Sequence, residues 1–177
     1  ELKSEYNIDP TRIYANGLSN GGGMTFLLSC RLSERIAATG SVGGAFTYPM
    51  DLCEPSRPVP MITFHGTADP IVPFYGGPSR DFDFPFPSIP VWVRDRASMN
   101  GCDPTPSLLP ASVAVSGIRY GDCDADADVV FYTIDGGGHT WPGGHPLPER
   151  ITGETNMDIS ASETMWRFFQ QFTLPRN

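Results

Sequence analysis

The sequence predicts an α/β protein with a largely parallel sheet, because short apolar segments alternate with segments of helical periodicity along its 177 residues. The apolar segments are rich in β-branched residues and bounded by glycine or proline, as strands buried on both faces are. With 40% hydrophobic residues, the chain can bury a core of ordinary size. No linker divides the periodic segments, so we expect one domain over residues 1–177.

The first half of the chain supplies a strand, a helix and two further strands. Residues 12–18 follow a turn signal and are predicted to form a strand, and residues 20–32 change at once to helical spacing. Residues 36–42 and 60–65 are short apolar runs typical of parallel strands. Ser19 therefore lies at the point where a strand passes into a helix.

The second half continues the alternation and closes on a helix. Residues 88–99 have helical spacing, and residues 111–120 and 128–135 are rich in strand-forming side chains. Residues 158–172 are predicted to be helical, starting with a capping box at Ser160. The apolar stripe of this helix is predicted to pack in the core: Met165, Trp166, Phe169 and Phe172.

Charge and hydropathy exclude two classes of partner. The formal net charge of −8 leaves no basic surface for a polyphosphate backbone. No apolar run approaches the ~18 residues that a membrane-spanning helix needs. We therefore expect neither a nucleic-acid partner nor a membrane partner.

The pairing of four cysteines would indicate the redox environment of the protein. Cys30, Cys53, Cys102 and Cys123 allow three full pairings, and none of their spacings is the C-x-x-C of zinc or thioredoxin-like sites. Pairing in sequence order, Cys30–Cys53 and Cys102–Cys123, would close two loops of about 20 residues, each contributing about 3 kcal/mol in the chain-entropy model. Two disulfides would indicate an oxidising compartment, whereas four buried free thiols would indicate a cytosolic enzyme.

The pentapeptide GLSNG at residues 17–21 fits the G-x-S-x-G pattern of a nucleophile elbow, and it lies in the strand-turn-helix context that the elbow requires. Glycines beside the serine let so tight a turn close without steric clash. We predict that Ser19 is a nucleophile. The helix that begins at Asn20 directs its N-terminal amides at a developing oxyanion, so the backbone N–H of Asn20 is the expected half of an oxyanion hole.

A serine hydroxyl needs a base to take its proton and a carboxylate to orient that base. Asp69 lies in the loop after the strand expected at 60–65, and His139 lies in a glycine-rich loop after the strand expected at 128–135. Both follow the carboxyl ends of strands, where open parallel sheets place their sites. The order serine, acid, histidine is that of α/β-hydrolases, so we predict a triad of Ser19, Asp69 and His139.

Other histidines and carboxylates are weaker candidates. His65 falls within an apolar strand, which favours a core or supporting role, and His145 lies in a proline-containing loop. Asp51 and Asp135 remain alternative acids, although Asp135 is too near the base in sequence. The alternating aspartates of residues 121–128 lack the glycine and glutamate of an EF-hand, so we predict no metal.

An aromatic series in the loops around the predicted site favours a platform for an aromatic or polymeric ester. Trp141, two residues after His139, is the first choice for a substrate contact, followed by Tyr75 and Phe86. The full series is Tyr75, Phe82, Phe84, Phe86 and Trp141.

Four segments resemble the corresponding blocks of secreted polyhydroxybutyrate depolymerase-like and feruloyl esterase-like enzymes of the α/β-hydrolase superfamily: IYANGLSNGGGMTFLLSC, VPMITFHGTADPIVPFYGG, IPVWVRDRASMNGC and FYTIDGGGHTWPGG. The resemblance spans residues 12–169. It implies an extracellular serine esterase that needs no cofactor and cleaves hydroxycinnamoyl esters of polysaccharides or hydroxyalkanoate polyesters through an acyl-enzyme. It places Ser19, Asp69 and His139 in the triad, and it is consistent with the two disulfides in sequence order.

An α/β-hydrolase normally has several strands before its elbow, together with the loop that supplies the second oxyanion N–H. Only 18 residues precede Ser19 here, so we expect the C-terminal portion of the fold without its N-terminal strands. Two other functions stay open. A peptidase of the same superfamily would use the same triad on an amide, and a catalytically inactive binding module would use none of it.

Overall fold

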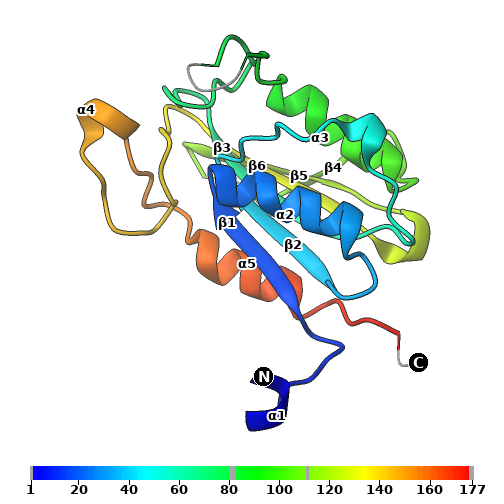
Figure 1. Cartoon of the computed structure of the whole chain (residues 1–177). Helices are drawn as coiled ribbons and strands as arrows, with labels where there is room; N and C mark the ends of the chain where they lie inside the picture. The colour runs from blue at the N-terminus through cyan, green and yellow to red at the C-terminus, as the bar shows by residue number, and fades with distance from the viewer. Residues whose placement is uncertain (1, 80–82, 111, 176–177) are drawn as a thin grey trace.

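The computed structural model describes residues 2–79, 83–110 and 112–175, and these form a six-stranded sheet in the order β1-β2-β3-β6-β5-β4 (Figure 1). β1, β2, β3 and β6 run parallel, and β5 and β4 add an antiparallel edge. The largely parallel sheet predicted from the sequence is confirmed. The strands are β1 Tyr14–Leu18, β2 Ala38–Val42, β3 Met61–Gly66, β4 Ser107–Leu109, β5 Val115–Tyr120 and β6 Val129–Ile134.

β4 and the start of β5 differ from the sequence prediction. The strand expected over residues 111–120 begins only at Val115, and Ala111 lies outside the described residues. β4 is three residues long and pairs with β5 along the edge of the sheet. Three residues are too few to show the alternating pattern of a strand in the sequence. The strand conformation of β4 depends on its pairing with β5.

Helices cover both faces of the sheet. α2 (Asn20–Arg31) and α3 (Ile89–Met99) lie over one face, and α5 (Ala161–Phe169) lies over the other (Figure 1). Within the described ranges, no helix is long and apolar enough to cross a lipid bilayer. The short elements are α1 (Leu2–Glu5), α4 (Glu149–Thr152) and the 3₁₀ turns η1 (Met50–Leu52) and η2 (Asp124–Asp126).

Alternate residues of the central strands contact opposite helices, as the pleat of a strand requires. Met61 packs into the apolar core under α2 and α3, whereas Ile62 and Phe64 pack into the core under α5. A Cβ at Gly40 would lie 2.7 Å from the sulfur of Met165 in α5. The central strands are thus buried on both faces.

α5 is shorter than predicted, and one member of its expected core stripe faces solvent. The hydroxyl of Ser160 accepts the N–H of Glu163 at 3.3 Å, which confirms the predicted N-terminal cap. Met165 and Phe169 are buried, but Trp166 is 55% exposed and meets the ring of Tyr14 edge-on. The prediction that Trp166 packs in the core is therefore wrong, because this residue lies at the flank of the stripe.

Both disulfides form in sequence order. Cys30–Cys53 joins the end of α2 to the residue after η1, and Cys102–Cys123 joins the segment after α3 to the segment after β5. All four cysteines are thereby used. The disulfides tie the helices of one face to loops at the amino-terminal side of the chain's parallel strands and leave the opposite strand ends free of cross-links.

Candidate active site

Ser19 occupies a strained turn between β1 and α2. Its backbone angles are φ 57° and ψ −121°, a region that residues with a Cβ rarely adopt. The N–H of Ser19 donates to the carbonyl of Val42 at 2.9 Å, and its own carbonyl accepts the N–H groups of Gly23 and Ala45, each at 3.0 Å. These three bonds hold the strained residue in place and leave its side chain half-buried at the turn.

The glycines of the elbow have unequal roles. A Cβ at Gly17 would lie 2.4 Å from the carbonyl carbon of Gly21, and a Cβ at Gly23 would lie 2.0 Å from the carbonyl oxygen of Ala45. Gly21 itself has open space where its Cβ would stand. The turn therefore requires glycine at positions 17 and 23. A side chain at position 21 would meet no other atom, so the turn itself does not require glycine there.

We expect Gly17→Ala to lower the free energy of unfolding by about 1–3 kcal/mol, as overpacked sites do. Gly21→Ala is the matched control, since a Cβ meets nothing there and alanine favours a helix by less than about 1 kcal/mol. Urea unfolding of the two variants beside the parent measures both effects. Equal losses in the two variants would contradict this account of the turn.

Asn20 is the first residue of α2, so its backbone N–H is among the four that have no acceptor within the helix. The positive end of the helix dipole lies at the same point. This geometry suits an oxyanion formed at Ser19. The role of Asn20 as an oxyanion donor stays a prediction.

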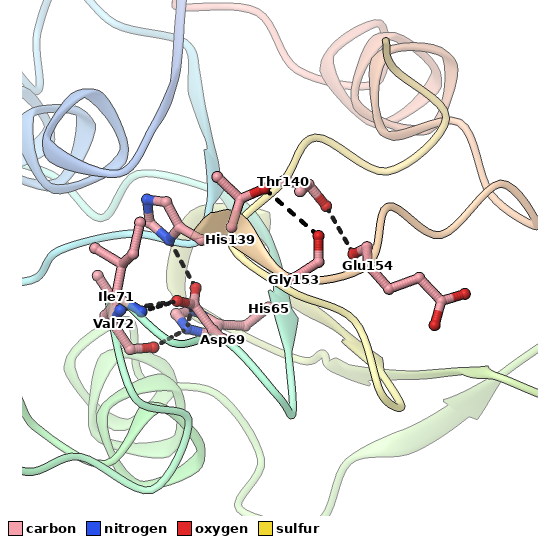
Figure 2. Close-up of polar contacts among 9 residues, drawn as sticks. His65, Asp69, Ile71, Val72, His139, Thr140, Gly153 and Glu154 are labelled. Atoms are coloured by element: carbon pink, nitrogen blue, oxygen red, sulfur yellow. Dashed lines mark hydrogen bonds and ion pairs between the residues drawn. The ribbon is translucent and has the colours of Figure 1, made fainter. Parts of the chain in front are cut away.

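The predicted acid and base lie in contact. The Nδ1 atom of His139 is 2.7 Å from the Oδ2 atom of Asp69, and the two residues are only 5% and 6% exposed (Figure 2). The other carboxylate oxygen, Oδ1, accepts the backbone N–H groups of Ile71 and Val72, each at 2.8 Å. With both oxygens of Asp69 engaged as acceptors, the Nδ1–H of His139 donates to the carboxylate, which leaves Nε2 as the basic atom.

The neighbouring strands β3 and β6 bring these two residues together. Gly66 pairs with Ile134 at the carboxyl ends of the strands, and the loops carrying Asp69 and His139 leave from there. A Cβ at Gly66 would lie 2.0 Å from the carbonyl oxygen of Gly137. The two loops can therefore pack backbone against backbone, which is what lets a short carboxylate reach the imidazole.

The last residue of α4 and the segment that follows it support His139 from its other side. The N–H of His139 donates to the carbonyl of Thr152, and the N–H of Gly138 donates to the carbonyl of Glu154 at 2.8 Å. The hydroxyl of Thr140 reaches the same Glu154 carbonyl at 3.2 Å (Figure 2). Backbone atoms make these contacts on the supporting segment, so no sequence motif could have disclosed them.

Ser19 and the Asp69–His139 pair lie on either side of the end of β2. Ser19 bonds to the carbonyl of Val42, and the next residue, Gly43, has φ 51° and faces the pair. A Cβ at Gly43 would lie 3.1 Å from His139 Nδ1 and 3.4 Å from Asp69 Oδ2. Sequence reasoning missed Gly43, although a glycine directly after a buried strand was its signal.

Within the described residues, no hydrogen bond joins the hydroxyl of Ser19 to His139. In enzymes without substrate such bonds are often long, and they tighten when substrate binds. The structure thus brings the predicted acid and base into contact and places Ser19 at the adjoining strand end.

The predicted substrate residues lie in different surroundings. Tyr75 is 77% exposed, and Phe84 is also exposed, whereas Phe86 is only 7% exposed and packs in the core under α2 and α3. Trp141 is half-buried, and its indole N–H donates to the hydroxyl of Ser162 in α5 at 3.0 Å. Phe82 lies outside the described residues. Tyr75 therefore offers the most accessible ring, and substrate contact by Tyr75, Phe86 or Trp141 stays a prediction.

The weaker candidates of the sequence have no hydrogen bond to Asp69 or His139 among the described residues, except that His65 contacts Asp69. His145, Asp51 and Asp135 are exposed, and Asp135 accepts a bond from the hydroxyl of Thr67 at 3.1 Å. His65 is buried, as its place in an apolar strand predicts. In the part of the chain that the structure describes, no group of three or more His, Cys, Asp or Glu side chains has an arrangement that could hold a metal ion.

Comparisons with known proteins find similarity to esterases. No family model matches the chain. The chain is 31% identical over 180 residues to "Putative esterase NocK" of Nocardia uniformis, covering 93% of this chain and 52% of that protein. It is 32% identical over 183 residues to feruloyl esterase B of Piromyces equi, covering 99% of this chain and 30% of that protein.

The solved structure of a thermostable esterase superposes on 97% of this chain, and the match covers 34% of the esterase chain, with a TM-score of 0.52 and 18% identity. At that identity the likeness concerns the fold alone. The chain spans about half the length of the first curated relative and less than a third of the second.

Proposed function

The chain is a homologue of feruloyl esterases and other esterases and has an α/β-hydrolase fold, and we propose that it belongs to the catalytic domain of a serine carboxylic ester hydrolase. The proposed triad is Ser19, Asp69 and His139. One observation carries the proposal. The imidazole of His139 meets the carboxylate of Asp69 at 2.7 Å, at the strand ends that adjoin the strained Ser19.

The geometry supports a two-step acyl transfer. The hydroxyl oxygen of Ser19 attacks the ester carbonyl while Nε2 of His139 takes its proton, and the carboxylate of Asp69 stabilises the imidazolium that forms. The N–H of Asn20 donates to the oxyanion of the tetrahedral intermediate. The intermediate collapses as His139 returns the proton to the leaving alcohol, which leaves an acyl group on Ser19. Water, deprotonated by the same histidine, then releases the acid.

The names of the relatives guide the choice of substrate. Several are called feruloyl esterases, so we propose a hydroxycinnamoyl ester of a polysaccharide as the substrate, with a hydroxyalkanoate polyester as the alternative. The exposed ring of Tyr75 is available as an aromatic platform. The two disulfides favour an extracellular site of action, because such bonds persist in oxidising compartments.

Assays of the whole protein on three substrates test this proposal. Methyl ferulate and 4-nitrophenyl acetate should be hydrolysed, and a peptide anilide should be hydrolysed at least 100-fold more slowly. Faster cleavage of the anilide would identify a peptidase. Absence of turnover on every ester, in protein that unfolds cooperatively, would favour a binding module and overturn the proposal.

A further inference from the structure

We propose that His65 is a positioning residue for this site, holding the loop of Asp69 so that the carboxylate meets His139. The inference rests on the proposed function, because it assigns the support of the same acid. It goes beyond the triad, since it gives a role to a second histidine that takes no part in the acyl transfer.

The contacts of His65 form a closed ring with the acid. Its Nε2 atom lies 2.9 Å from the carbonyl oxygen of Val72 and 3.5 Å from Oδ2 of Asp69, and both side chains are fully buried (Figure 2). The N–H of Val72 in turn donates to Oδ1 of Asp69 at 2.8 Å. Strand β3 supplies His65 and the following loop supplies Asp69 and Val72, so the imidazole fastens the loop back onto its own strand.

The hydrogen bonds fix the tautomer of His65. A carbonyl oxygen can only accept, so Nε2 carries the proton and donates it to Val72. Nδ1 is buried and has no partner among the described residues. A second proton on Nδ1 would therefore be left without an acceptor, which favours the neutral ring.

The charge of His65 matters because the carboxylate of Asp69 lies within 3.5 Å of the rings of both His65 and His139. The charged or titratable groups that face His65 are Asp69 and His139, and burial lowers the pKa of His65 from its ordinary value of 6.5 despite the opposing influence of Asp69. A neutral His65 leaves the full negative charge of the carboxylate to the His139 imidazolium. A protonated His65, 3.5 Å from Oδ2, would compete for that charge.

Core packing alone does not account for a histidine at this position. The ring lies near Phe74, in surroundings that an aliphatic side chain could fill without placing an unpaired Nδ1 in the interior. The polar atom that does find partners is Nε2, and both of its neighbours belong to the loop that carries the acid. The polar contacts of His65 are thus made with the loop whose position the proposed site depends on.

Three substitutions in the whole protein test the inference. The amide nitrogen of His65→Gln reaches the position of Nε2 and can still donate to Val72. The amide nitrogen of His65→Asn stands at the position of Nδ1 and cannot reach the carbonyl of Val72. The side chain of His65→Leu has no donor. With 4-nitrophenyl acetate we expect kcat to fall about 10- to 100-fold in the Asn and Leu variants, because a misplaced catalytic group has an effect of that size. KM should stay within about two-fold, since the substrate contacts are untouched.

The pH profile separates positioning from simple destabilisation. In His65→Asn and His65→Leu the acid limb of kcat/KM should move to lower pH, because the imidazolium of His139 loses its aligned counter-ion. His65→Gln should recover most of kcat and return the limb toward the parent position. If all three variants lose kcat equally with an unmoved limb, or keep it within two-fold, the inference is wrong. Should the Leu variant not fold, the Gln and Asn pair decides.

A second readout does not depend on turnover. The Nδ1–H of His139 bonded to Asp69 should give a low-field proton resonance in the parent. That resonance should weaken or move upfield in His65→Asn but persist in His65→Gln. A parent without ester turnover would overturn the proposed function while this resonance still tests His65. An unchanged resonance in all three variants would overturn the positioning role.

Discussion

Replacing Ser19 by alanine should lower the kcat of the whole protein on 4-nitrophenyl acetate by about 10⁴-fold or more, the size of effect seen when a serine nucleophile is removed. In the proposed reaction the hydroxyl oxygen of Ser19 forms the only covalent bond between the protein and its substrate. Alanine keeps a Cβ at the same backbone position, so the bonds from Ser19 to Val42, Gly23 and Ala45 can persist. The loss should therefore appear in kcat with little change in the free energy of unfolding.

Ser98→Ala is the matched control, because Ser98 is an exposed serine on α3. It should retain the parent kcat within about two-fold, as surface substitutions away from a site do. If Ser19→Ala keeps a tenth or more of the parent activity, another nucleophile carries the reaction and the triad is wrong.

The second large effect is expected from Asp69→Asn, with a fall in kcat of about 10⁴-fold. Oδ1 of Asp69 accepts two backbone N–H groups, so the carbonyl oxygen of asparagine will take that place. Its NH₂ group must then face His139 and donate to Nδ1. The imidazole is driven into the tautomer with its proton on Nε2, and that atom can no longer accept the proton of Ser19.

Asp135→Asn tests the alternative acid in the same assay. Asp135 is exposed and bonds to Thr67, so its substitution should leave kcat within about two-fold. A loss confined to Asp135→Asn, with Asp69→Asn active, would transfer the role of acid to Asp135.

The parts of the site that could be predicted are local. The strand, the glycines and the helix around Ser19 follow one another within residues 12–32, and their chemistry predicts a tight turn whichever way the rest folds. Asp69 and His139 each follow an apolar run, and parallel strands place such positions at one edge of the sheet. Asp69 and His139 become neighbours because β3 pairs with β6. That pairing follows from the fold as a whole, and neither segment alone predicts it.

What could not be predicted depends on contacts between distant segments. Gly43 and the backbone carbonyls of Thr152 and Glu154 adjoin His139 without any side-chain chemistry of their own. Trp166 and Phe86 have ordinary apolar side chains, and only the packed structure determines which of the two is exposed. His65 could be assigned to the interior, but its bond to Val72 becomes visible only when the loop is in place.

The most direct test of the triad is mass spectrometry of the whole protein after reaction with a fluorophosphonate, which phosphonylates an activated serine. We expect one adduct per molecule, mapped by peptide sequencing to Ser19, with ester hydrolysis lost in proportion to labelling. Labelling should also fail in Asp69→Asn, which keeps Ser19 but holds His139 in a tautomer that cannot accept the serine proton. An adduct on a different residue, or full ester turnover in protein that takes up no label, would rule out Ser19 as the nucleophile.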